Sequence, residues 1–255
     1  MEKLLIISGL VMMPILTAMS QDPAYWAFRP LEAVEVPVVN DKQWVRNEID
    51  HFVLARANEK GVFPNGPADR QTLIRRVYFD LTGLAPVRDE VAEFVESTSP
   101  DAYGKIISRL LSSPHYGERW GRHWLDVARF GESHGYESDN ERPTAWTYRD
   151  AVIRALNEDM PFDRFVRWQV AGDVLQGDDP LATALTGFIT SGSTVTNVDG
   201  VDRERATYDK MDDIVSATGA AFLGLTIGCA RCHDHKYDPI SQEDYYRLVG
   251  FLLPG

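Results

Sequence analysis

The sequence predicts an all-α protein: an irregular multi-helix domain preceded by an extended N-terminal arm. Two observations support this fold class. Beyond residue 44, apolar residues recur at helical spacing through most of the chain, as expected when one face of each helix is buried. No stretch shows the convincing alternation of apolar and polar residues that is typical of a half-buried strand.

The first twenty residues, MEKLLIISGLVMMPILTAMS, have the layout of a secretory signal peptide. A short charged start leads into an apolar stretch, and a small-x-small site ends at Ser20. The apolar run over residues 4–19 contains Pro14 and is shorter than the ~20 residues that a membrane span requires. We therefore expect a signal peptide over residues 1–20, export to the periplasm or cell surface, and no membrane span in the mature chain.

The remaining chain divides into an arm and a helical domain. Residues 21–43 are rich in proline and lack helical periodicity, which predicts the extended arm. Residues 44–255 form the helical domain, with helices expected over 47–61, 69–83, 86–97, 99–113, 114–130, 144–159, 161–173, 180–190 and 203–227. The sequence stops on the apolar run YYRLVGFLLPG, so we expect the domain to be truncated at its C-terminus.

The charge balance argues against one class of partner. The chain has 38 acidic and 26 basic residues, a formal net charge of −12. A protein of this charge repels phosphate backbones, so general nucleic-acid binding is not expected.

The stretch GLTIGCARCHDHKYDP contains both cysteines of the chain, Cys229 and Cys232, with His233 directly after them. Covalent attachment of haem c needs two thiols for the two porphyrin vinyl groups and a neighbouring histidine for the iron. The sequence therefore predicts haem c tethered at Cys229 and Cys232, with His233 as the proximal ligand.

Three other uses of the two cysteines remain open. A CxxC pair can be a reactive redox dithiol, or simply a disulfide across a tight turn. It can also contribute to a structural zinc site. The histidines that could complete such a site are His233, His235, His115, His123 and His134.

For the sixth ligand of a haem iron, three sources stay open: an upstream residue, the missing C-terminal part, or water. The mature chain has no methionine after the CxxCH, because Met160 and Met211 both precede it. His123 is a candidate second axial or haem-pocket ligand, since we expect it to point inward on a helical stripe; a core histidine is the alternative. Tyr116, Trp120, Trp124 and Val127 share this stripe. Met211 is expected to pack in the core, and the pair Asp212–Asp213 to face water.

A second polar cluster lies in GESHGYESDNERP, between two expected helices. His134, Glu137 and Asp139 could bind a metal ion there, or supply an acid and a base for hydrolysis. A solvated loop is the alternative. Nearby aromatic residues leave a sugar-binding cleft possible, since aromatic rings suit such ligands: Tyr136, Trp146 and Tyr148.

Six stretches in order resemble one known family: AYWAFRP, RRVYFDLTGLAP, SPHYGERWGRHWLDVARF, AWTYRDAVI, NEDMPFDRFVRWQVAGD and GCARCHDHKYDPISQEDYY. Together they are similar to the planctomycete-type cytochrome-associated domain of unknown function. The resemblance implies an exported bacterial protein with a CxxCH near the end of the domain, usually followed by a second domain. It implies no particular biochemical activity.

Three functional hypotheses follow. The first is an exported c-type haem protein that exchanges electrons with a redox partner protein or a C-terminal partner domain. The second is a carbohydrate-active or other hydrolytic module with structural zinc or a disulfide at the CxxCH. The third is a non-catalytic extracellular assembly module. No small-molecule substrate is indicated by the sequence.

Overall fold

The computed structural model describes residues 26–41, 43–136, 139–195 and 202–252. These residues are mostly helical and contain no strand, which confirms the all-α class; a single isolated bridge joins Ser133 and Glu141. The predicted signal peptide over residues 1–20 lies outside the described residues. Among the described residues, no helix combines the length and the hydropathy required to cross a bilayer.

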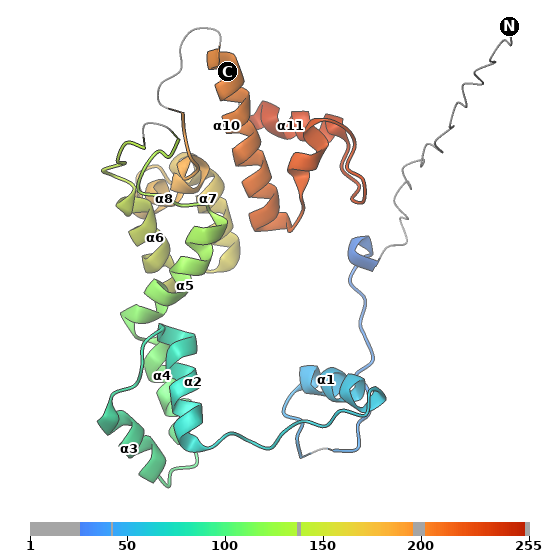
Figure 1. Ribbon diagram of the computed structural model, residues 1–255, viewed down its shortest axis with the longest axis vertical. Coiled ribbons are helices and arrows are strands. Elements are labelled where there is room, and N and C mark those ends of the chain that lie inside the picture. Colours follow the sequence, from blue (N-terminus) through green and yellow to red (C-terminus); the bar gives the residue numbers. More distant parts are fainter. Residues whose placement is uncertain (1–25, 42, 137–138, 196–201, 253–255) are drawn as a thin grey trace, which may run out of the picture.

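The elements follow one another along the chain as drawn in Figure 1. They are η1 (Trp26–Phe28), α1 (Glu48–Glu59), α2 (Arg70–Thr82), α3 (Arg88–Glu96), α4 (Ala102–Leu111), α5 (Pro114–Val127), α6 (Trp146–Asn157), α7 (Phe162–Leu175), α8 (Pro180–Leu185), α9 (Gly187–Thr190), α10 (Asp202–Thr218), η2 (Gly219–Leu223), η3 (Ile227–Arg231) and α11 (Gln242–Leu252).

The N-terminal arm is extended after η1 and rests on α1. The ring Nδ1 of His51 donates to the carbonyl of Pro37 at 2.8 Å, and Val39 is buried. In Figure 1 the arm and α1 stand apart from the other helices, connected to α2 by the irregular residues 62–69.

Helix ends follow the capping residues of the sequence. The side chain of Asp69 accepts the backbone N–H of Thr72 at the start of α2, and Gly83 ends this helix in the left-handed region at φ 71°. A left-handed residue at this position closes the last turn, and glycine adopts it without steric penalty. The expected stop at Gly83 is confirmed.

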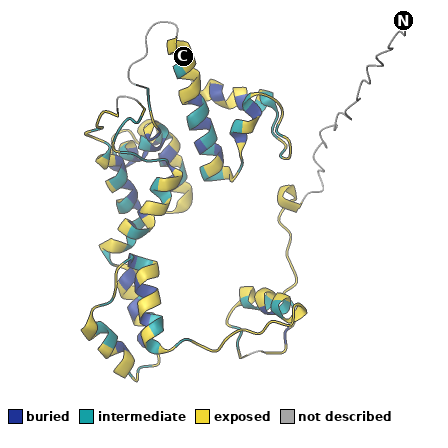
Figure 2. Ribbon diagram, in the orientation of Figure 1, coloured by how far each residue is buried: buried dark blue, intermediate teal, exposed yellow. Residues whose placement is uncertain are grey.

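Buried side chains form three cores, visible as dark blue stripes in Figure 2. The first lies among α2, α3 and α4 around Ile74. The second joins α5 to α9 around Val152 and Phe188. The third is formed by α10, η3 and α11 around Ile214 and Tyr245, and it supports the two cysteines.

The expected inward stripe on α5 is wrong for three of its five residues, and a fourth, Tyr116, is half-buried. Trp120, His123 and Val127 are exposed, while Trp124 packs against the second core. The closest contact with α6 is instead made through Gly117 and Gly121, both buried. A Cβ at Gly117 would lie 2.5 Å from the carbonyl oxygen of Ile153. The backbones approach so closely here that a wide aromatic residue cannot lie between them.

The helix expected over 203–227 is also shorter than predicted. Regular α-helix ends at Thr218, a π-helical turn follows, and Gly224 reverses the chain at φ 65°. The reversal brings Ile227 back against η2, where a Cβ at Gly219 would lie 2.6 Å from its side chain. Ile227 also packs with Ile214 of α10 in the third core. Residues after Gly224 therefore fold against the helix that precedes them, and this places the cysteines beside α10.

Candidate functional site

The two cysteines lie on η3, a 3₁₀-helix, and at the residue that caps it. Three residues complete one turn of a 3₁₀-helix, so residues three apart point in the same direction. Ile227 and Ala230 form the buried side of the turn. Cys229 and Cys232 form the other side, where both are exposed and unbonded. The spacing of the motif therefore presents two free thiols on one face.

Glycine lets η3 approach α10. A Cβ at Gly228, directly before the first cysteine, would lie 2.4 Å from the Oγ of Ser216. That separation is far below van der Waals contact, so a larger residue here would require Ser216 or the turn to move.

The side chain of Arg231, between the cysteines, anchors the turn to α10. Its guanidinium donates to Asp209 Oδ1 at 2.8 Å and to Asp212 Oδ2 at 3.1 Å. These two carboxylates raise the pKa of Arg231, so the side chain stays charged. Tyr245 on α11 donates to the other oxygen of Asp212 at 2.6 Å. Asp212 thus connects η3 and α11 through one carboxylate.

Asp212 and its neighbour Asp213 were expected to face water, and this expectation is wrong. Asp213 accepts from Arg129 Nε with both oxygens, at 2.8 and 2.9 Å. Both carboxylates therefore join α10 to other parts of the chain.

The backbone around the cysteines is also bound to α11. The carbonyl of Arg231 accepts from the Gln242 side chain and from the Tyr246 hydroxyl, each at 3.1 Å. The carboxylate of Asp234 accepts the backbone N–H of Gln242 at 2.8 Å. The CxxCH segment is held on both sides before any ligand binds.

His235 shapes the turn after the motif. Its side chain is only 5 % exposed. Ring Nδ1 accepts the backbone N–H groups of Asp238, at 2.8 Å, and of Tyr237, at 3.2 Å. Because Nδ1 accepts, the ring proton is on Nε2, which donates to the hydroxyl of Thr226 at 2.9 Å.

His233 has the opposite tautomer. Its Nδ1 lies 2.7 Å from the carbonyl oxygen of Asp234. A carbonyl can only accept, so Nδ1 carries the proton and Nε2 keeps its lone pair. Metal-binding histidines commonly donate their second ring N–H to a carbonyl in this way. His233 is exposed, so its Nε2 is available to a metal. Both ring nitrogens of His235, in contrast, are already hydrogen-bonded.

The residues of this turn fit a c-type haem. Two free thiols lie on one face, and the adjacent histidine has the tautomer that leaves Nε2 available to iron. They also have the donor types of a partial zinc site. Among the described residues, however, no three His, Cys, Asp or Glu side chains are grouped to hold a metal ion.

A profile of PSCyt2, described as a protein of unknown function (DUF1549), matches residues 48–254. The chain belongs to the PSCyt2 family. The family is a planctomycete cytochrome-associated domain of unknown function, which confirms the resemblance of the sequence motifs. Comparisons with curated proteins and with solved structures found no match.

In the polar loop of this PSCyt2 domain, residues 131–142, charged side chains bond backbone groups, whereas the cysteine turn presents free donor atoms. Asp139 Oδ1 accepts the backbone N–H of Gly135 at 3.2 Å, and Arg142 donates to the carbonyls at the end of α9. Nδ1 of His134 is buried and has no partner in the described part of the chain. Glu137 lies outside the described residues, so a second metal site at His134, Glu137 and Asp139 stays a prediction.

Two other candidates in PSCyt2 can be placed. His123 lies on the exposed side of α5 with its ring 5.5 Å from that of Trp120, and its role as an axial ligand also stays a prediction. Met211 is buried in the third core beneath η3, as the packing alternative expects.

Sequence reasoning missed the residues that hold the CxxCH in place. They come from two helices that flank the motif in the chain, and they are Asp209, Asp212, Gln242, Tyr245 and Tyr246. The three-residue spacing of Asp209 and Asp212 on one helix face was the available signal. It was overlooked because acidic pairs on helices usually face water.

Proposed function

We propose that this PSCyt2 protein is an exported c-type haem protein that transfers single electrons to or from a partner. The observation that carries the proposal is the pairing of two free thiols with the Nδ1–H tautomer of His233 on one exposed turn. The signal-peptide layout of residues 1–20 supports export, because haem c is attached outside the cytoplasm. The family's association with cytochromes points the same way.

The residues have separate roles in this proposal. The thiols of Cys229 and Cys232 would hold the haem, each by adding across one porphyrin vinyl group, with sulfur bonding one carbon and the thiol proton passing to the other. No oxidant or leaving group is needed. His233 offers Nε2 to the iron. When bound, the haem supplies reversible one-electron chemistry.

The surrounding residues position the attachment turn and do not react. Arg231 holds the turn against α10 through its two carboxylate partners, while its backbone carbonyl is held by α11. His235 fixes the turn that follows and is withheld from the metal by its own hydrogen bonds. Electron transfer requires no additional acid or base.

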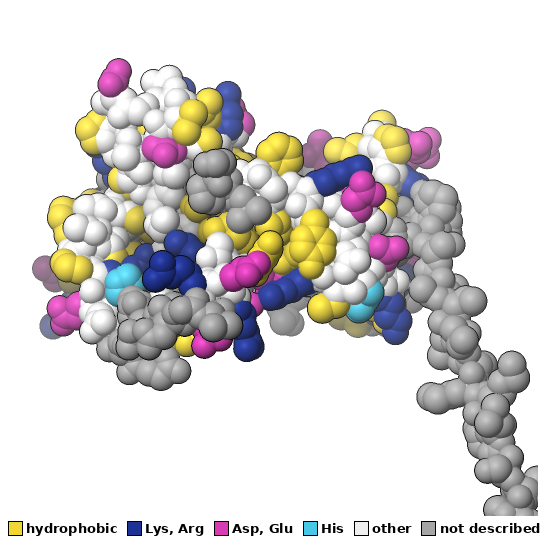
Figure 3. Space-filling model, turned by 90° about the horizontal axis from the view of Figure 1, so that it is seen from above, with side chains coloured by type: hydrophobic (Ala, Val, Ile, Leu, Met, Phe, Trp, Pro, Cys, Tyr) yellow, Lys and Arg dark blue, Asp and Glu magenta, His cyan; other side chains and the backbone are white. Residues whose placement is uncertain are grey.

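The partner is a redox protein or a C-terminal partner domain that approaches the exposed side of the turn. Viewed from above in Figure 3, hydrophobic side chains are exposed among charged ones. Tyr237, Tyr246 and Phe251 are among the large exposed side chains near the turn in sequence. Mixed surfaces of this kind suit a transient partner better than a permanent one.

The test is haem content. We would express the full chain in a periplasm that matures a control cytochrome c, and stain a denaturing gel for covalent haem. A stained band that disappears in Cys229→Ala/Cys232→Ala supports the proposal. An unstained wild-type band contradicts it, and metal analysis of the same sample then separates a zinc site from a disulfide.

A matched pair of histidine variants tests the ligand. His233→Ala should change the optical spectrum of the iron or abolish attachment. His235→Asn should leave the iron spectrum unchanged where the protein folds, because its oxygen can replace the acceptor Nδ1. An iron spectrum altered only in the His235 variant would contradict the assigned tautomers.

A further inference from the structure

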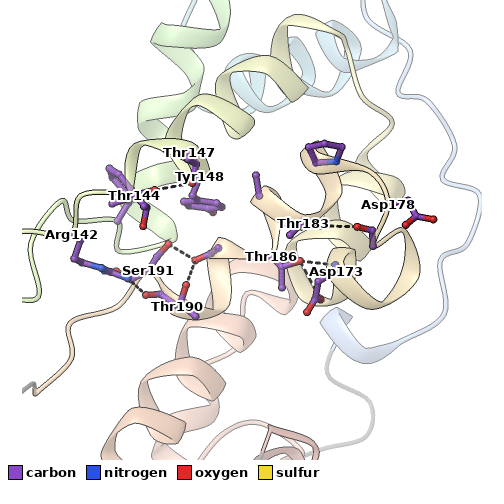
Figure 4. Close-up of a pocket in the computed structure, with 16 residues that line it drawn as sticks. Arg142, Thr144, Thr147, Tyr148, Asp173, Asp178, Thr183, Thr186, Thr190 and Ser191 are labelled. Atoms are coloured by element: carbon purple, nitrogen blue, oxygen red, sulfur yellow. Dashed lines mark hydrogen bonds between the residues drawn. The ribbon is translucent and has the colours of Figure 1, made fainter.

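A pocket of about 600 Å³ lies among α6, the end of α7, α8 and α9. It is formed by residues other than those of the CxxCH turn. Figure 4 shows Arg142 at one end and Asp173 and Asp178 at the other, with threonine side chains between them. Its volume is within the ~300–1,000 Å³ typical of small-molecule sites.

Most hydroxyl groups of the pocket donate a hydrogen bond to another group of the protein. Thr147 donates to the Thr144 carbonyl at 2.8 Å. Ser191 and Thr190 both donate to the Gly187 carbonyl, at 2.7 and 3.3 Å. Thr183 donates to the Gly177 carbonyl at 3.4 Å. A hydroxyl that donates inward keeps oxygen lone pairs for a ligand, so these groups act as acceptors.

A kink in α7 adds a carboxylate to this surface. Ala171 has non-helical angles, φ −151° and ψ 36°. After the kink, the backbone N–H of Asp173 donates to Thr186 Oγ1 at 3.0 Å. A side chain that bonds the backbone at a helix break stabilises the new direction. The Asp173 carboxylate consequently lies at the pocket instead of continuing along the helix.

The charged groups at the two ends of the pocket differ in whether they are already bound to the protein. Neither Asp173 nor Asp178 forms an ion pair with a described residue. The guanidinium of Arg142 donates to the carbonyls of Thr190 and Ser191 at the end of α9. Asp173 Oδ1 accepts from the Thr186 hydroxyl at 3.4 Å, but neither carboxylate is paired with a described cation. These carboxylates and the hydroxyl oxygens therefore make the pocket rich in acceptors.

We propose that this pocket binds a saccharide unit through the ligand's own hydroxyl protons. Each hydroxyl of a sugar can donate to one of the oxygens spaced along the threonine walls or to the two carboxylates. The half-buried ring of Phe130 lines the same pocket, and aromatic rings suit the C–H faces of a sugar. Tyr148 also lines it but is buried. A simple ammonium ion is too small to reach the carboxylates at one end and the hydroxyl oxygens at the other end of the pocket together. An anion would meet the carboxylates. This inference is independent of haem attachment.

The test is calorimetric titration of the full chain with maltose, cellobiose and lactose, each paired with its permethylated form. Permethylation keeps the ring and its acceptors but removes every donor. We expect at least one disaccharide to bind with a Kd of about 1 mM. Its permethylated form should bind at least about tenfold more weakly.

Variants locate the binding. Thr183→Val and Thr190→Val, combined, should weaken the disaccharide about four- to tenfold, since each removes one accepting oxygen. Thr207→Val is the matched control, because Thr207 is an exposed threonine of α10 whose hydroxyl likewise donates to a carbonyl one turn back, that of Arg203. The control should bind like the wild type.

Three results would overturn the proposal. One is no binding of any of the three disaccharides at about ten times the expected Kd. Another is equal binding of the free and permethylated sugars, because donors would then be irrelevant. The third is binding of glucosamine without binding of glucose, which would assign the pocket to ammonium ligands.

Discussion

The turn after Cys232 and the loop over residues 131–142 look alike in sequence, since each has a histidine among carboxylates. They differ in how their hydrogen bonds are used. In the turn, both ring nitrogens of His235 are hydrogen-bonded, whereas Nε2 of His233 and the two thiols remain available. In the loop, Asp139 and Arg142 serve the backbone, and the buried Nδ1 of His134 has no partner among the described residues. A polar cluster becomes a candidate site when the surrounding hydrogen bonds leave particular ligand-binding atoms exposed and without a partner.

The largest difference is expected between two histidine variants. His235→Ala removes the acceptor of two backbone N–H groups and the donor to Thr226, and should lower the free energy of unfolding by about 3 kcal/mol. His134→Ala should lower it by about 1 kcal/mol, because its Nδ1 bonds no described residue. Chemical denaturation measures both.

The matched control for this pair is His235→Asn, which keeps an acceptor oxygen near the position of Nδ1. It should recover part of the stability that His235→Ala loses. Equal losses in His235→Ala and His134→Ala would remove the proposed difference between the two regions.

Two glycine variants should give the next effect. Gly228→Ala places a Cβ 2.4 Å from Ser216 Oγ, and should cost about 2 kcal/mol by overpacking. Gly135→Ala in the loop is strained by its φ of 70° and should cost about 1 kcal/mol. If thermal unfolding ranks the loop variant as the less stable, then close packing against α10 does not fix the cysteine turn.

A smaller effect is expected for the anchoring arginine. Arg231→Met removes the cation shared by two half-exposed carboxylates, although Asp212 keeps Tyr245 and Asp209 keeps the more distant Arg205. It should destabilise the domain by about 1–2 kcal/mol. Arg167→Met is the control, since its ion pair with Asp163 is exposed on one helix and should contribute under about 0.5 kcal/mol. Added salt should weaken both contributions, and identical losses would argue against an anchoring role.

The smallest effect concerns alkaline pH. Burial and the bond to Asp212 raise the pKa of Tyr245 above its ordinary value of 10.0. A folded-state pKa that is raised gives stability that is fully present below the unfolded pKa and is lost as pH rises through the folded pKa. Unfolding midpoints should therefore fall above about pH 10, and less steeply in Tyr245→Phe. Tyr237→Phe, which changes an exposed ring, should keep the wild-type slope.

The sequence predicts the helical class and several helix ends well, because capping residues such as Asp69 and Gly83 act locally. It fails where helices meet. The aromatic residues of α5 predicted a buried stripe, yet the contact with α6 is made by Gly117 and Gly121. A hydrophobic pattern cannot reveal how closely two backbones approach.

The candidate site shows the same limit. Cys229, Cys232 and His233 could be named from spacing alone. The tautomers of His233 and His235 could not, because they depend on which carbonyl and amide groups the turn brings near each ring. The anchoring role of Asp212 depends on a chain reversal at Gly224, which helical periodicity did not predict.

The anchors of η3 also bear on the thermodynamics of the proposed haem attachment. Bonds from α10 and α11 hold the backbone and side chain of Arg231 in the folded protein. The conformational entropy of this segment is therefore lost during folding and is not lost again when a ligand joins the thiols. Such preorganisation raises the effective concentration of the second thiol once the first has reacted. The distance between the two cysteines is therefore fixed by the packing of α10, η3 and α11 together.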